Sequence, residues 1–264
     1  NVGSENAIGE ILVFTDSDIV LSHDVLERGL KYRKENPEIS GFFGLFSEKL
    51  RYENFLSQYK HLYLCHLYSK QGEERSTFDT SLSFIDKKIF DKFKFNENIK
   101  YLGEDAELAM RMIKEGHVIK QVPTIRMEHL KKYNFTGFVK SEYARAKQFT
   151  KLLFKAVLKD KKESGKSTFY LKPLNIYLNV ALMPFLILFL VLALIFNSLA
   201  LTFSASAIFF ILIILNLGFW NYLRKRKGFV FAVKAFFVSF FDMIVMDLGI
   251  MVATTIFIMK DKFD

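Results

Sequence analysis

Cysteine and proline are scarce in this chain of 264 residues, which contains one cysteine, Cys65, and four prolines. A single cysteine excludes an internal disulfide framework and is typical of a reducing compartment. The first ten residues, NVGSENAIGE, contain neither an initiating methionine nor the apolar core of a signal peptide. We therefore expect the sequence to begin inside a domain whose N-terminal part is missing.

Charged residues are absent from Pro173 to Leu223. A helix needs about 20 apolar residues to cross a bilayer, so this run predicts two spans, near residues 174–196 and 202–223, joined at Asn197. A very apolar globular core is disfavoured, because soluble core helices carry a polar face. A later apolar stretch contains Asp242 and Asp247 and predicts a third span near residues 240–259, so the number of spans is two or three.

Basic residues outnumber acidic ones, 37 to 28, for a net charge of +9. This excess favours an anionic partner such as nucleic acid, a phosphorylated substrate or a membrane surface. The basic residues cluster beside the apolar runs, at Arg224–Lys227 and across residues 140–172. The positive-inside rule then predicts a multi-pass protein of the cell membrane with both flanks in the cytoplasm. Without an aromatic-basic surface, nucleic acid is not expected as a partner.

Composition predicts three regions: a soluble domain at residues 1–158, a basic juxtamembrane linker at 159–172 and a membrane region at 173–264. Before the linker, Lys147 and Lys151 begin a stripe of lysines spaced four apart that continues to Lys159. On a helix this basic stripe lies beside an apolar one. Such a helix either rests on an anionic bilayer surface or packs against its own domain.

The soluble region alternates strand and helix patterns, which predicts an α/β sheet with ligands at the carboxyl ends of its strands. Ser22 is the expected N-cap of the first predicted helix. Predicted strands cover residues 11–15, 39–46, 80–85 and 117–122, and predicted helices cover 22–35, 51–69, 87–93 and 105–115.

Two aspartates, Asp16 and Asp18, end the first strand in the stretch ILVFTDSDIV. If the strand continues through them, both side chains point the same way. Two carboxylates in one site repel unless a cation relieves them, and Mg²⁺ or Mn²⁺ with oxygen ligands would do so. The alternative is that they are solvated turn residues, which are common after strands.

The segment GEILVFTDSD, followed later by GEDAELAMRM, resembles the inverting nucleotide-sugar glycosyltransferases of family 2, which have the GT-A fold. In that family an apolar strand ends in Asp-x-Asp, and a later Glu-Asp-x-(Asp/Glu)-Leu opens a helix that carries an arginine. The segments NVGSENAIGE and FKFNENIKYLGED also resemble the family's approaches to these motifs. The resemblance covers residues 1 to about 150 and implies a partial GT-A domain followed by transmembrane helices.

The resemblance also implies a role for each matching residue. Asp16 and Asp18 would bind the donor substrate and, with His129, a divalent cation that neutralises the nucleotide diphosphate. Asp105 would be the general base for the acceptor hydroxyl, with Glu104 beside it in the catalytic site. From the residues alone, His129 is as well explained as a hydrogen-bonded strand histidine, and acids at a helix start also act as caps.

Two further residues, Arg111 and Arg145, stand near family motifs. Arg111 is expected to be structural, paired with Glu107 one helical turn away. Arg145 lies where polymer-forming members carry Gln-x-x-Arg-Trp, and it is assigned to substrate binding although the rest of that motif is missing. The departure favours transfer of one or a few sugars to an acceptor such as a lipid-linked glycan. The family's N-terminal nucleotide-binding part also has no counterpart here.

Two other functions compete with this interpretation. The stretch VFTDSDIV also fits haloacid-dehalogenase-like phosphatases, in which Asp16 would be the nucleophile and Asp18 its acid/base partner. That interpretation does not explain Glu104 or His129. A non-catalytic membrane scaffold is the third possibility.

Overall fold

The computed structural model of the chain describes residues 1–75, 77–99, 103–154 and 174–260. Two compact units make up the chain, Asn1–Tyr133 with Leu152–Tyr170 and Asn134–Lys151 with Leu171–Asp264. The predicted linker at 159–172 lies outside the described residues, as do Lys155 and Lys159 of the lysine stripe.

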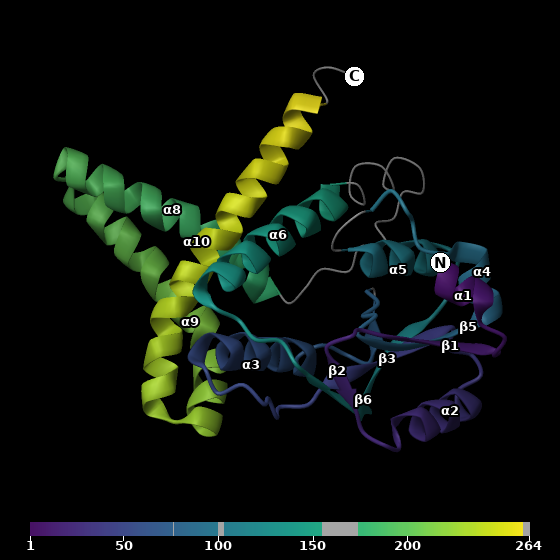
Figure 1. Cartoon of the computed structure of the whole chain (residues 1–264). Coiled ribbons are helices and arrows are strands. Elements are labelled where there is room, and N and C mark those ends of the chain that lie inside the picture. Colours follow the sequence, from purple (N-terminus) through teal and green to yellow (C-terminus); the bar gives the residue numbers. More distant parts are fainter. Residues whose placement is uncertain (76, 100–102, 155–173, 261–264) are drawn as a thin grey trace. The chain divides into compact units, whose positions relative to one another are not determined.

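The first unit contains one mixed sheet (Figure 1). Its strands run in the order β1-β5-β3-β6-β2, and β4 pairs with β6. Strands β3 and β6 are parallel, whereas the other pairs are antiparallel. This mixed sheet with its helices confirms the expected α/β class. The strands are β1 (Ile11–Thr15), β2 (Ile19–Leu21), β3 (Gly41–Phe46), β4 (Glu74–Arg75), β5 (Leu82–Asp86) and β6 (Ile119–His129).

Helices cover both faces of this sheet, with α2 on one face and α4 and α5 on the other (Figure 1). Strand β3 explains the layering, because neighbouring side chains on a strand point to opposite faces. Phe42 packs with Val25 of α2, while Phe43 belongs to the core that contains Leu108 of α5. The helices of this unit are α1 (Val2–Asn6), α2 (Val25–Glu35), α3 (Phe55–Ser69), α4 (Lys87–Phe93) and α5 (Glu104–Lys114).

Helix starts differ from the sequence predictions more than helix ends do. The prediction for α4 is confirmed at both ends, and α2 ends at Glu35 as predicted. Ser22 is not the N-cap of α2, because Asp24 holds that position. The Ser22 hydroxyl instead donates to Asp24 Oδ1 at 2.8 Å, so the serine supports the cap residue rather than the helix itself.

The second unit holds most of α6 (Phe135–Phe154) and three further helices. These three are α8 (Leu174–Phe196), α9 (Leu199–Lys227) and α10 (Phe229–Lys260). Each is long and apolar enough to cross a membrane, which agrees with three spans. Helix α10 is continuous from Phe229, so the third apolar helix starts earlier than the predicted residue 240.

One polar pair joins two of the apolar helices. Asn179 of α8 and Asn216 of α9 are buried and exchange side-chain hydrogen bonds of 3.1 and 2.8 Å. In a bilayer a buried amide without a partner is costly, so a reciprocal pair aligns the helices specifically.

Gly29 tests the packing of α2 on the sheet. A Cβ atom at this buried helical position would lie 2.3 Å from the ring of Phe84, which itself stacks on Phe42 at 4.8 Å. Exchange of glycine for alanine in a helix normally stabilises by about 1 kcal/mol. We expect Gly29→Ala instead to destabilise the first unit by about 1–3 kcal/mol, measured by chemical denaturation of the whole chain.

Gly3→Ala is the matched control, because a Cβ atom at this helical glycine meets nothing within 4 Å. A Gly29→Ala variant as stable as the Gly3→Ala variant would contradict the close contact between α2 and Phe84.

Candidate functional site

Asp16 follows directly after β1, but it does not share a strand with Asp18. Strand β1 ends at Thr15, and Ser17 and Asp18 form a turn before β2. The expectation that both aspartates project from one strand face is therefore wrong. Asp16 is instead held by the residue before β5: its N–H donates to Ser81 O at 3.2 Å, and the Ser81 hydroxyl donates to Asp16 Oδ2 at 2.9 Å.

Asp18 and His129 meet because β2 pairs with the end of β6. Ile19, the first residue of β2, lies opposite His129, and Leu130 N–H donates to Asp18 O at 2.7 Å. The two side chains are then close, with His129 Nε2 3.5 Å from Asp18 Oδ2. An antiparallel pair of only three residues thus joins two predicted metal ligands that are far apart in the sequence.

An irregularity in β6 allows this pairing. The register between β3 and β6 shifts after Gly44, which lies opposite Val122, and resumes with Leu45 opposite Arg126. Pro123 falls in the skipped segment, where a residue without a backbone N–H is tolerated. Beyond this bulge β6 runs on to His129, seven residues past the predicted end of the strand at residue 122.

His129 lies in surroundings that favour its neutral form. Burial lowers the pKa of its imidazole below the ordinary value, although the negative charge of Asp18 acts in the opposite direction. The ring stacks on Phe46 with the centroids 5.0 Å apart. A neutral imidazole is the form that binds a metal ion. Lys131 adds a positive charge, with its Nζ 3.7 Å from Asp18 Oδ2.

Asp105 lies in the first turn of α5, as predicted. Gly103 precedes the helix with φ of 104°, a conformation that favours glycine, and the chain turns there into α5. Burial, reinforced by the negative charges of Asp79 and Glu104, raises the pKa of Asp105 to about 7. The residue as a whole is half-buried.

Asp79 is a site residue that the sequence reasoning missed. It precedes β5, where Tyr68 OH donates to its Oδ2 at 2.6 Å and Ser81 N–H donates to its Oδ1 at 3.0 Å. Its charge acts on both Asp105 and His129. The sequence offered only an aspartate two residues before a serine, a common turn pattern without a specific chemical meaning.

A chain of hydrogen bonds connects Asp79, whose charge raises the pKa of Asp105, with Asp16. It runs from Tyr68 through Asp79 to Ser81 and ends on Asp16. Asp16, Asp18 and Asp79 all act electrostatically on His129. Carboxylates that lie close together repel one another, and a bound cation relieves that repulsion.

Glu104 and Arg111 take different places on α5. The Oε2 atom of Glu104 is buried and has no hydrogen-bond partner among the described residues. Arg111 pairs with Glu107 at 3.0 Å and donates to Phe93 O and Lys94 O at 2.5 and 2.6 Å. The structural role predicted for Arg111 is thus confirmed.

Arg145 lies on α6 in the second unit, where its Nε is 3.9 Å from Glu142 Oε1. Its assignment to substrate binding stays a prediction.

A divalent cation fits part of the predicted ligand set. Within the described ranges, no group of three or more His, Cys, Asp or Glu side chains is arranged to hold a metal ion. Asp18 and His129 nevertheless offer an oxygen and a neutral nitrogen 3.5 Å apart, close enough for both to bind one ion. A substrate diphosphate would supply further oxygen ligands, as it does for cations that keep few protein contacts.

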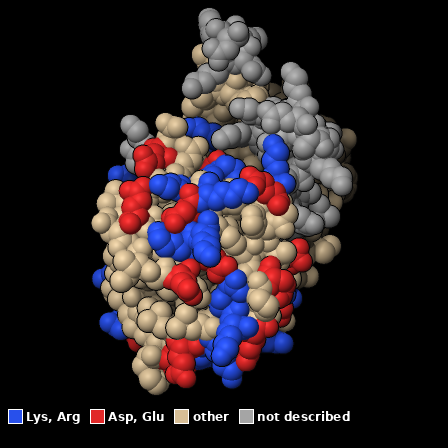
Figure 2. All heavy atoms as spheres, turned by 90° about the vertical axis from the view of Figure 1, so that its right-hand side faces the viewer, with Lys and Arg blue, Asp and Glu red and all other residues tan. Residues whose placement is uncertain are grey.

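Charges of both signs are interspersed on the face of the molecule in Figure 2. Exposed ion pairs of the first unit, such as Lys94 Nζ with Glu5 Oε1 at 2.7 Å, mix the signs in the same way. This face therefore does not present the broad basic surface that binding to a nucleic acid backbone requires.

Comparison with known proteins gives a match in structure but not in sequence. No family model and no curated protein sequence matches the chain. The structure is similar to that of the mannosyltransferase PcManGT from Pyrobaculum calidifontis, which was solved in complex with GDP-Man and Mn²⁺. The TM-score is 0.53 at 16% sequence identity, and the match covers 95% of this chain and 64% of that chain. The chain thus has a glycosyltransferase-type fold, a partial GT-A domain followed by three apolar helices.

Asp18→Asn tests the cation site. Loss of the carboxylate charge should weaken Mn²⁺ binding by about tenfold or more, because the neutral amide that replaces it no longer compensates the charge of the cation. Binding is followed by the electron paramagnetic resonance signal of free Mn²⁺ in the presence of a nucleoside diphosphate. Asp24→Asn is the matched control, since Asp24 is paired with Arg28 at 2.7 Å. Equal Mn²⁺ affinity of the two variants would contradict the site.

Proposed function

We propose that this chain belongs to a membrane-bound, metal-dependent glycosyltransferase of family 2, which transfers a sugar from a nucleoside-diphosphate donor to a hydroxyl acceptor with inversion. The observation that carries the proposal is the position of Asp105. Burial and the charges of Asp79 and Glu104 raise the pKa of its carboxyl group to about 7. The charge of Asp79 also acts on His129, which with Asp18 forms the proposed pair of metal ligands.

The donor half of the reaction is assigned to Asp16, Asp18 and His129. A bound Mg²⁺ or Mn²⁺ would neutralise the charge that develops on the departing diphosphate. The similarity to a mannosyltransferase with bound GDP-Man and Mn²⁺ supports this assignment. Lys131 lies beside Asp18 and would add a second positive charge for the same phosphates.

The acceptor half is assigned to Asp105. Its carboxylate takes the proton of the acceptor hydroxyl as that oxygen attacks the anomeric carbon from the side opposite the diphosphate. The new C–O bond forms while the bond from the anomeric carbon to the diphosphate oxygen breaks, and its electron pair stays on the diphosphate. A carboxylate with an ordinary pKa of 3.8 is a weak base, so the higher pKa of Asp105 strengthens it for this task.

The acceptor is proposed to be a lipid-linked glycan, with the catalytic unit in the cytoplasm. Three helices apolar enough to cross a membrane hold the chain at the bilayer, where such acceptors reside. The absence of a Gln-x-x-Arg-Trp motif around Arg145 favours transfer of one or a few sugars.

Asp105→Asn should lower the transfer rate at least about a hundredfold while donor binding remains, because the amide cannot accept the proton of the acceptor. The rate is measured with a radiolabelled nucleotide sugar and the intact protein in its membrane. Asp91→Asn removes one exposed carboxylate from α4 and serves as the control with unchanged rate. Wild-type transfer by the Asp105→Asn variant would exclude Asp105 as the base.

Asp79→Asn should move the acid limb of the pH–rate profile to lower pH. Asp105 acts as the carboxylate, so the rate rises as pH passes its pKa of about 7. Asp79 is one of the charges that raise this pKa, and its neutralisation lets Asp105 ionise at lower pH. The profile is recorded at saturating donor. An acid limb that stays in place would show that Asp79 does not set the pKa of the base.

A further inference from the structure

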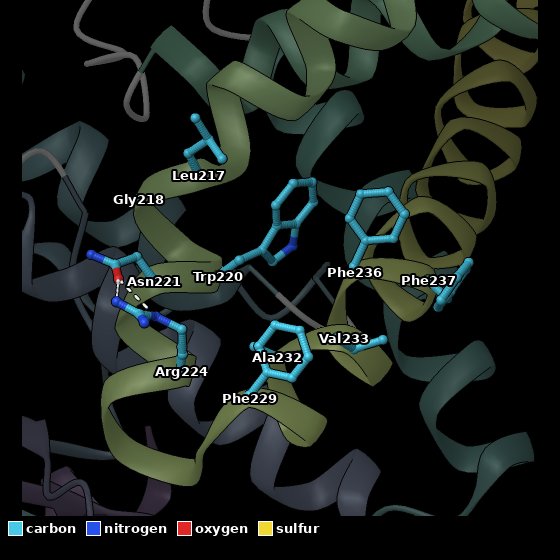
Figure 3. Close-up of a pocket in the computed structure, with 10 residues that line it drawn as sticks. All are labelled: Leu217, Gly218, Trp220, Asn221, Arg224, Phe229, Ala232, Val233, Phe236 and Phe237. Atoms are coloured by element: carbon cyan, nitrogen blue, oxygen red, sulfur yellow. Dashed lines mark hydrogen bonds between the residues drawn. The ribbon is translucent and has the colours of Figure 1, made fainter.

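A cavity of about 720 Å³ lies within the second unit, between the end of α9 and the start of α10. Aromatic side chains dominate its lining, and Figure 3 shows Trp220, Phe229 and Phe236 around it. The cavity falls at the turn where the chain leaves one apolar helix at Lys227 and enters the next at Phe229. The cavity is open on one side, and its largely apolar walls are suited to a hydrocarbon chain, since burial of apolar surface against apolar surface is favourable.

One side of the cavity is polar and positively charged. Arg224 and Asn221 line it together, away from Phe236 (Figure 3). Asn221 Oδ1 accepts hydrogen bonds from Arg224 Nη2 at 3.0 Å and from Arg224 Nε at 3.3 Å, which holds the guanidinium at the cavity. A guanidinium held in this way presents donors in a geometry that suits a phosphate group.

The charge around this side is of one sign. Arg224 begins the basic run that continues to Lys227, and Lys234 follows on α10. The sequence contains no acidic residue between Glu163 and Asp242, so these basic residues have no acidic neighbour in the sequence. Basic residues at the end of a membrane helix attract anionic lipid headgroups.

We propose that this cavity is a binding site for an anionic phospholipid of the bilayer. One acyl chain occupies the aromatic part beside Trp220, and the headgroup phosphate accepts hydrogen bonds from Arg224. The site joins the two helices at their turn and makes the α9–α10 pair dependent on anionic lipid. It does not depend on the proposed sugar transfer, and it would stand if that function were wrong.

Trp220 offers a direct probe, because it is the one tryptophan of the chain and lines the cavity. The intact protein is placed in vesicles that contain acyl-brominated phosphatidylglycerol or acyl-brominated phosphatidylcholine at equal mole fraction. Bromine quenches tryptophan fluorescence at short range. We expect phosphatidylglycerol to occupy the site with about fivefold preference, the effect of one basic residue on an anionic headgroup.

Variants distinguish binding of the headgroup by Arg224 at the cavity from a general attraction of anionic lipid to the basic residues. Arg224→Gln should remove the preference, and Arg224→Lys should restore part of it. Lys225→Gln removes the same charge from a residue that does not line the cavity and should leave the preference in place. Gly218→Leu should reduce quenching by both lipids, because it fills the cavity: a Cβ atom at Gly218 meets nothing within 4 Å. Thermal midpoints confirm that each variant is folded.

Three outcomes would overturn the proposal. Equal quenching by the two lipids would show that the headgroup is not recognised. An equal loss of preference in Arg224→Gln and Lys225→Gln would assign the effect to bulk charge. Displacement of brominated phosphatidylglycerol by a polyprenyl phosphate at a much lower mole fraction would assign the cavity to that lipid instead.

Discussion

The burial of the Asp105 carboxyl group beside Asp79 is the interaction on which the functional interpretation depends. Removing a carboxylate from water and placing it near another negative charge favours its protonated form, which is why its pKa rises to about 7. Structural aspartates are usually arranged to avoid this cost. Here Tyr68 holds Asp79 in place through a 2.6 Å hydrogen bond, so the repulsion is built into the fold. A carboxyl group that ionises near neutral pH is its chemical consequence, and such a group suits the proposed role of a general base.

The same sheet that positions Asp79 also brings together the proposed cation ligands. Strand β5 places Ser81 against Asp16, and the short β2–β6 pair places His129 against Asp18. Each contact joins segments that are distant in sequence, and each depends on strand register. A shift of one residue would turn the side chains to the opposite face, so the sheet fixes the site as well as the core.

The sequence correctly predicted the elements whose formation depends on residues that are close together in the chain. The helix at residues 87–93 and the first apolar helix, Leu174–Phe196, have the predicted bounds, because capping, turn and hydropathy signals act over a few residues. Strand β2 was missed since three residues give no periodic signal, and its existence depends on a partner more than a hundred residues away in β6. Asp79 was missed for a related reason: it gains its role only through Tyr68 and Asp105, to which no motif connects it.

The central claim is that the carboxylates and His129 form a site for a cation and a nucleoside diphosphate. Calorimetry of the intact protein with UDP and GDP, each with and without Mn²⁺, tests it most directly. Binding that requires Mn²⁺ is the predicted result, since the diphosphate meets a cluster of acids that only a cation can bridge. Failure to bind either nucleotide with Mn²⁺, together with tight binding of the phosphate mimic beryllium fluoride that Asp16→Asn abolishes, would contradict the account and favour a phosphatase.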